Sequence, residues 1–197
     1  MYIRYLRIEN IRQCAMARQK SNPQVSLKPQ DLVVLLRLTL EAEAMPTYAV
    51  LALELGLTSS EIHAGLARAQ QAQLVFKGED GKPRLVREAL RQFVLHGARY
   101  AFPAVRGEVT RGLPTLYAAS PIKEKIIAPN ELPPVWPDKN GKVRGMTLYP
   151  LYPSVPYAAE RNPALYELLV LFDALRAGSA RERGIAQDLL NERLGAA

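Results

Sequence analysis

The sequence contains a single cysteine, Cys14, and no long uninterrupted hydrophobic run. One thiol can form neither a disulfide within the chain nor a cysteine-based metal site, which suits a reducing compartment. The longest apolar stretch, residues 32–40, is interrupted by Arg37 and is too short to span a bilayer. The N-terminus also lacks the apolar core of a signal peptide. We therefore expect a cytoplasmic protein that does not enter a membrane.

Sequence motifs of catalysis are lacking as well. The chain has only two histidines, and they do not have the spacing of paired metal ligands. It contains no glycine-rich phosphate loop and no nucleophile elbow. These absences predict a protein that is not an enzyme and that uses no cofactor.

Hydrophobic residues make up 48% of the 197 residues, which is enough to bury a core in one or two domains. The net charge of +7 suits an anionic partner, but it is unevenly distributed. Residues 1–25 hold five basic residues and one acidic residue, whereas residues 26–97 hold eight of each. Any attraction between residues 26–97 and an anion must therefore come from local clusters of positive charge.

The chain divides into four zones of different composition. Residues 1–25 form a basic extension that we expect to be partly flexible. Residues 26–97 alternate between helical and strand-like patterns. Residues 98–156 are rich in proline, and residues 157–197 have the apolar spacing of a helical hairpin. In that hairpin, Asn162 and Pro163 begin one helix, Gly178 ends it, and Ser179 with Glu182 forms the capping box of the next.

The proline-rich zone contains ten of the fifteen prolines, between Pro103 and Pro156. Proline lacks a backbone donor and fixes φ, so this zone cannot be regular helix. It nevertheless carries many large apolar side chains, including Trp136, which a solvated linker would not. We therefore predict an ordered, extended segment that packs against the body of the protein or a partner subunit.

Residues 26–97 have the pattern of three helices followed by a hairpin. Apolar spacing predicts helices at 29–43, 48–55 and 59–71. Gly56 can adopt the left-handed conformation that reverses the chain between the second and third helices. Thr58 and Glu61 have the spacing of a capping box at the start of the third helix. Two helices joined by a short glycine turn predict a helix-turn-helix, whose second helix enters the DNA major groove.

The third helix has one apolar face, marked by Ile62 and Leu66 four residues apart. Ser60 and His63 point the other way, and Ser59 and Ser60 lie in its first turn, where recognition helices meet base edges. His63 is either a base reader or a surface histidine without a role. Arg68 lies on the flank of the helix and can pair with a phosphate or with a carboxylate.

Two short strand-like runs, at 74–77 and 82–86, follow the third helix. The turn between them contains Asp80-Gly81, a strong hairpin signal, and Pro83 restricts the second strand to a sheet edge. Positive side chains surround the tip of this hairpin and either contact phosphates or are ordinary solvated charges: Lys77, Lys82 and Arg84.

The stretch from Leu55 to Val75 resembles the helix-turn-helix of MarR-like winged-helix transcription regulators, and the resemblance covers about residues 27–97. It implies a mainly α fold with a small β-hairpin wing. By position it also implies base-edge or phosphate roles for Ser59, Ser60 and His63, and phosphate roles for Lys77, Lys82 and Arg84. The wing of that family usually carries an Asp-x-Arg element, which Asp80-Gly81-Lys82 matches loosely.

These observations predict a transcriptional regulator that binds double-stranded DNA as a homodimer. The alternative is a protein-interaction adaptor, or an antitoxin-like autoregulator that holds a partner protein encoded by a neighbouring gene. Winged helices also serve as protein-docking modules, and the outer face of the third helix has two alanines and no arginine at its centre.

Overall fold

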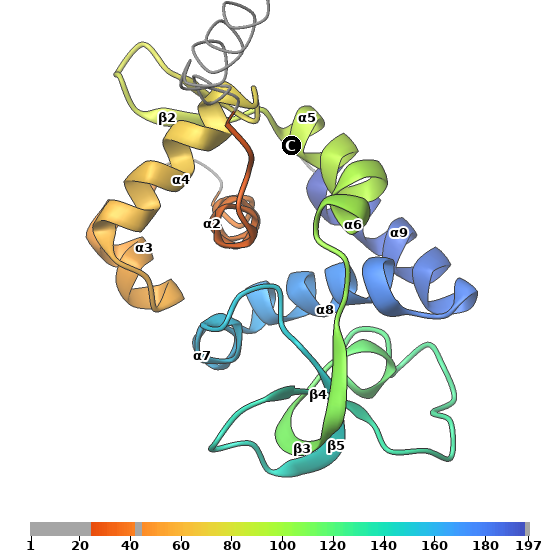
Figure 1. The fold of residues 1–197 in the computed structure, drawn as a ribbon. Helices are drawn as coiled ribbons and strands as arrows, with labels where there is room; N and C mark the ends of the chain where they lie inside the picture. The colour runs from red at the N-terminus through yellow and green to blue at the C-terminus, as the bar shows by residue number, and fades with distance from the viewer. Residues whose placement is uncertain (1–24, 42–44, 196–197) are drawn as a thin grey trace, which may run out of the picture.

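The computed structural model describes residues 25–41 and 45–195. In this part of the chain the fold is mixed α/β, with helices predominating over a two-stranded antiparallel sheet and a separate three-stranded sheet (Figure 1). A mainly helical fold with one small hairpin was predicted, whereas the second sheet was not. Apart from Val25, the predicted basic extension of residues 1–25 lies outside the described residues.

Three helices and the hairpin gather at one end of the molecule (Figure 1). Helix α2 is buried along its whole length after the first turn, and it packs against both α4 and α8. The elements are α2 (Pro29–Leu38), α3 (Tyr48–Leu55), α4 (Ser59–Gln71), β1 (Val75–Lys77) and β2 (Pro83–Leu85).

Helix α2 is shorter than predicted, because it ends at Leu38 rather than at residue 43, which lies outside the described residues. The guanidinium of Arg87 donates to the carbonyl oxygens of Thr39 (3.2 Å) and Glu41 (2.8 Å). The last carbonyl groups after a helix have no partner within the helix. Here the Arg87 side chain supplies the donors that these carbonyls need, and the chain ends its helix earlier than predicted.

The hairpin is followed by a helical stretch that leads to the other end of the molecule. It begins with α5 (Arg87–Gln92), widens into a π-helical turn over Phe93–Gly97, and closes with α6 (Ala98–Ala101). Helix α5 packs against α9, and α6 packs against α8.

The proline-rich zone is ordered and forms a small closed sheet of three strands, β3 (Arg106–Pro114), β4 (Pro134–Pro137) and β5 (Val143–Leu148). Strand β3 pairs antiparallel with both others, and β4 and β5 pair parallel. The strands approach closely at two glycines. A Cβ atom on Gly112 would lie 1.9 Å from the Trp136 carbonyl oxygen, and one on Gly145 would lie 2.0 Å from that of Pro133.

A buried polar cluster holds this sheet against α8. Both carboxylate oxygens of Asp173 accept hydrogen bonds: Oδ2 from Thr115 Oγ1 (2.9 Å) and Trp136 Nε1 (2.5 Å), and Oδ1 from Arg176 Nε (2.8 Å). Arg176 also donates to the carbonyl oxygen of Tyr149 (2.8 Å). Burial raises the pKa of Asp173, while Arg176 and the donated hydrogen bonds act in the opposite direction.

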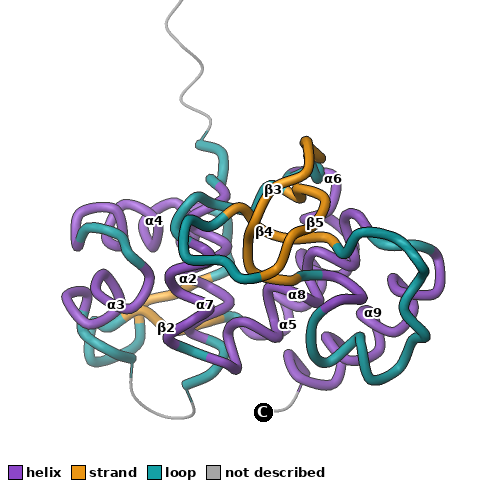
Figure 2. Tube along the Cα trace, turned by 90° about the horizontal axis from the view of Figure 1, so that it is seen from below, coloured by secondary structure: helices purple, strands orange, loops and turns teal. Residues whose placement is uncertain are grey.

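Three helices complete the chain: α7 (Val155–Arg161), α8 (Pro163–Ala177) and α9 (Ala180–Gly195). The predicted caps are confirmed, since Asn162 Oδ1 accepts from Leu165 N (3.0 Å), and Ser179 and Glu182 form their capping box. Helices α8 and α9 pack against each other as a hairpin. Helix α8 runs between the α2–α4 helices and the three-stranded sheet and contacts both sides (Figures 1 and 2). None of the described helices is long and apolar enough to cross a membrane.

Candidate nucleic-acid interface

The turn between α3 and α4 reverses the chain at Gly56, which has the predicted left-handed conformation (φ 63°, ψ 38°). The backbone N–H of Leu57 donates to the carbonyl oxygen of Ala52 (2.9 Å), as at a glycine-terminated helix. A Cβ atom on Gly56 would lie 3.0 Å from Cδ1 of Tyr157 in α7. The turn therefore needs glycine both for its backbone conformation and for the packing of α7.

Replacing Gly56 with alanine is expected to lower the free energy of unfolding by about 1–2 kcal/mol for the left-handed conformation, and by more if Tyr157 cannot move. Urea unfolding followed by circular dichroism measures this. The matched control is Gly184→Ala in α9, where an added Cβ meets nothing within 4 Å. That substitution should raise the free energy of unfolding by about 0.5–1 kcal/mol, and a similar loss for both variants would contradict the prediction.

The first turn of α4 is held by the predicted capping box. Thr58 Oγ1 accepts from the Glu61 N–H (3.2 Å), and Glu61 Oε2 accepts from the Thr58 N–H (2.8 Å). The Thr58 hydroxyl also donates to Glu61 Oε2 (2.8 Å), and the two hydrogen bonds that this oxygen accepts from Thr58 lower the pKa of Glu61. The hydroxyl of Tyr152 donates to Glu61 Oε1 (3.4 Å), so the residues just before α7 also contact the start of α4.

The inner face of α4 is fixed to α2 by a two-bond ion pair. Arg68 donates from Nε (2.7 Å) and Nη2 (2.6 Å) to the two carboxylate oxygens of Asp31, whose side chain is 1% exposed. The hydrogen bond to Asp31 raises the pKa of Arg68. A Cβ atom on Gly65 would lie 2.9 Å from Asp31 Oδ1, so a glycine here allows the close approach. Asp31 also accepts from the N–H of Lys28 (2.8 Å), which caps α2.

The outer face of α4 is exposed and carries Ser59, Ser60 and His63. The His63 ring makes an edge contact with the Tyr48 ring of α3, with the ring centroids 6.0 Å apart. Ser59 and Ser60 lie in the first turn of the helix. The three side chains are therefore accessible to a partner along one side of the helix.

A short, hydrogen-bonded link joins α4 to the hairpin. Gln73 has φ 59°, and the N–H of Leu74 donates to the carbonyl oxygen of Ala69 (2.9 Å), so β1 begins directly after the helix. The predicted pairing is confirmed, with Val75, Phe76 and Lys77 opposite Leu85, Arg84 and Pro83.

Charges at the tip of the hairpin are organised by Asp80. Its carboxylate accepts from the Lys82 N–H (3.1 Å), which lowers its pKa, and forms an ion pair with Arg84 (3.2 Å). Lys77 and Lys82 are exposed, and their ammonium groups have no hydrogen bond or ion pair within the described ranges. These two lysines are therefore the positive charges best placed to meet an anion.

Of the seven residues predicted to contact DNA, six are exposed on α4 and the hairpin: Ser59, Ser60, His63, Lys77, Lys82 and Arg84. Arg68 is turned inward, and of its two predicted partners the structure contains the carboxylate. That carboxylate belongs to Asp31, which local spacing in the sequence does not connect with Arg68. The available signal was an acidic residue at the start of a helix that is otherwise nearly apolar all round.

The described part of the chain contains no group of three or more His, Cys, Asp or Glu side chains that could hold a metal ion. Comparisons with protein-family models, with curated proteins and with solved structures found no significant match to the chain.

Proposed function

We propose that the chain is a cytoplasmic transcriptional regulator that binds double-stranded DNA through a MarR-like winged helix-turn-helix and acts as a homodimer. In this proposal α3 and α4 are the helix-turn-helix, and the β1–β2 hairpin is the wing. Helix α4 lies in the major groove, and the hairpin contacts the adjacent phosphates. The proposal assigns no catalysis and no cofactor to the chain.

The observation that supports this proposal best is that the two faces of α4 differ in exposure and in contacts. One face is joined to α2 by Asp31 and Arg68, while Ser59, Ser60 and His63 on the other face are exposed. A helix held rigidly on one side, with small polar side chains in its first turn, can approach a groove without rearranging. The hairpin adds two unpaired lysines beside it.

A homodimer would place two copies of α4 in successive major grooves, about 34–36 Å apart. The exposed face of the three-stranded sheet is a candidate contact between copies, because it carries Val109 of β3, which is 41% exposed. Helix α8 is mostly buried, whereas one side of α9 is exposed.

The test is a gel-shift titration with the DNA upstream of the protein's own gene, at two salt concentrations. Lys77→Ala combined with Lys82→Ala should weaken binding by about 10–30-fold near physiological salt, because two phosphate contacts are lost. The slope of log affinity against log salt should fall by about 2. The matched control is Lys139→Ala with Lys142→Ala, which removes two exposed lysines from the connection between β4 and β5. A shift that weakens equally in both double variants would contradict a specific role for the hairpin.

A second candidate function is supported by exposed apolar side chains on α3. Leu53 is 73% exposed and Val50 is 44% exposed, and the outward face of α4 carries no lysine or arginine. Both features suit a protein partner better than a polyanion. An adaptor or antitoxin-like protein would co-purify with the product of a neighbouring gene, and Leu53→Ser should release that product. An adaptor would also show no gel shift at low salt, whereas an autoregulatory antitoxin would show both.

A further inference from the structure

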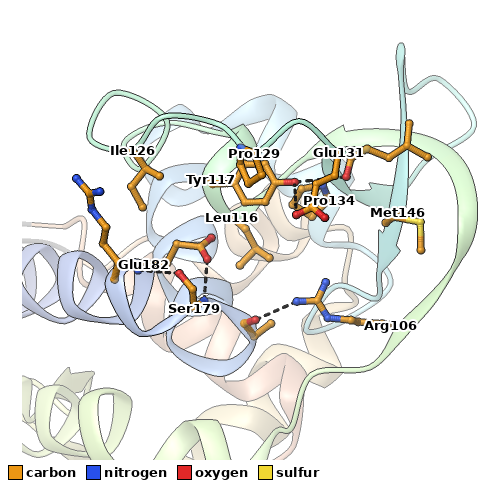
Figure 3. A pocket seen from close by; sticks show the side chains of 13 residues that line it. Arg106, Leu116, Tyr117, Ile126, Pro129, Glu131, Pro134, Met146, Ser179 and Glu182 are labelled. Atoms are coloured by element: carbon orange, nitrogen blue, oxygen red, sulfur yellow. Dashed lines mark hydrogen bonds between the residues drawn. The ribbon is translucent and has the colours of Figure 1, made fainter.

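A cavity of about 330 Å³ lies on the far side of the molecule from α3 and α4. Its walls come from the loop between β3 and β4, from β5, and from the turn between α8 and α9 (Figure 3). A volume near 300 Å³ is at the small end of ligand pockets and suits a molecule about the size of an amino acid.

The cavity is lined by a buried carboxylate with an unused acceptor. Glu182 is 7% exposed, and its Oε2 accepts from the Ser179 N–H (2.7 Å) in the capping box of α9. Its Oε1 is buried and has no hydrogen-bond partner among the residues that the structure describes. A buried acceptor without a donor is costly, and a charged N–H donor satisfies a carboxylate best. The Glu182 side chain therefore favours a ligand that carries an ammonium group.

Two arginines line other parts of the same cavity. Arg106 donates one hydrogen bond, from Nη2 to the carbonyl oxygen of Ala177 (3.0 Å), and Figure 3 shows it across the cavity from Glu182. Arg181 is exposed and has no hydrogen bond or ion pair in the described ranges. Glu131 is the fourth charged residue of the lining, so the two positive and two negative charges balance. A balanced but separated set of charges suits a zwitterion better than a simple cation or anion.

The remaining surface of the cavity is largely apolar. Leu116 lies at its base, and Ile126 and Met146 lie on opposite sides (Figure 3). The hydroxyl of Tyr117 is near Glu131 Oε1 (3.5 Å) and the Leu132 carbonyl oxygen (3.4 Å). Burial, with a contribution from Glu131, raises the pKa of Tyr117, so this hydroxyl stays protonated and can donate.

We propose that this cavity binds a free amino acid with an apolar side chain. The ammonium group donates to Glu182 Oε1, the carboxylate pairs with Arg106 or Arg181, and the side chain lies against Leu116, Ile126 and Met146. This inference concerns a surface distant from α4 and does not depend on DNA binding.

The test is isothermal titration of the full chain, without DNA, using L-leucine and two fragments of it. Isocaproate lacks the amine and isoamylamine lacks the carboxylate. L-leucine should bind, and each fragment should bind at least about tenfold more weakly, because each loses one charged pairing. No heat of binding with millimolar L-leucine, or a fragment that binds as tightly as L-leucine, would overturn the proposal.

Two variants on one helix separate a binding role of Glu182 from its capping role. Glutamine can replace glutamate in a capping box, so Glu182→Gln should keep the fold while weakening L-leucine binding at least about tenfold. The control is Glu192→Gln, an exposed position of α9, which should leave the affinity unchanged. Equal affinities in Glu182→Gln and the unsubstituted protein would refute the assignment. Circular dichroism and the melting temperature would establish that both variants fold. Arg106→Ala combined with Arg181→Ala removes both partners of the ligand carboxylate and should also weaken binding.

Discussion

Arg68→Ala should lower the free energy of unfolding by about 3–5 kcal/mol, the usual cost of removing one partner from a buried ion pair. The alanine removes both charged donors of the Asp31 carboxylate, which is 1% exposed, and leaves it only the backbone N–H of Lys28. Chemical denaturation followed by circular dichroism measures the effect. Because the same pair fixes α4 to α2, the DNA binding that we propose should weaken as well, although Arg68 itself does not face outward.

Two comparisons test this explanation. Arg193→Ala removes an arginine whose ion pair with Glu167 is one-third exposed on both sides, and it should cost no more than about 1 kcal/mol. Asp31→Asn combined with Arg68→Met removes both charges, and it should recover much of the lost stability, because no unpaired charge stays buried. If Arg68→Ala costs no more than Arg193→Ala, the ion pair is not what fixes α4.

Asp173→Ala is expected to cost a similar amount, about 3–5 kcal/mol. Removing this carboxylate leaves the Arg176 guanidinium, the Trp136 indole N–H and the Thr115 hydroxyl without their shared acceptor. Trp136 is the only tryptophan and is fully buried, so its fluorescence reports directly on this cluster. The variant should show a red-shifted emission maximum together with a lower urea midpoint.

The matched control for Asp173→Ala is Asp188→Ala, at an exposed position of α9. It should change the free energy of unfolding by no more than about 0.5 kcal/mol. Asp173→Asn keeps one acceptor oxygen and should fall between the two. An unchanged tryptophan spectrum in Asp173→Ala would mean that the sheet does not depend on this cluster.

Local signals in the sequence predicted the α3–α4 region closely. Helices were expected at 48–55 and 59–71, and the structure has these bounds. Gly56, Thr58 and Glu61 act through neighbours no more than a few residues away, so their roles can be inferred from spacing alone. The same holds for the caps of α8 and α9.

The three-stranded sheet could not be predicted in the same way. Its longest strand, β3, pairs with β5 more than thirty residues later. Gly112 is required because the carbonyl oxygen of Trp136, from another strand, leaves no room for a Cβ atom. Ten prolines in the zone also suppress the alternation that marks a strand. Order and packing could therefore be inferred from composition, but not which segments pair.

The candidate site shows the same limit. Surface positions such as Ser60 and His63 follow from helical periodicity, and the structure has them exposed. Arg68 could not be assigned, because its partner Asp31 precedes it by 37 positions and belongs to another helix. The end of a helix can also depend on a distant residue, since Arg87 supplies the donors for the carbonyl groups that follow α2.

Helix α8 connects the two ends of this protein. It touches α2 on one side and, through Asp173, the three-stranded sheet on the other. Tyr157, just before it, rests on Gly56 and donates to the carbonyl oxygen of Leu53 (3.1 Å). The position of α4 therefore depends on α8. A substitution that destabilises the packing of the three-stranded sheet on α8 is expected to affect the α3–α4 surface as well.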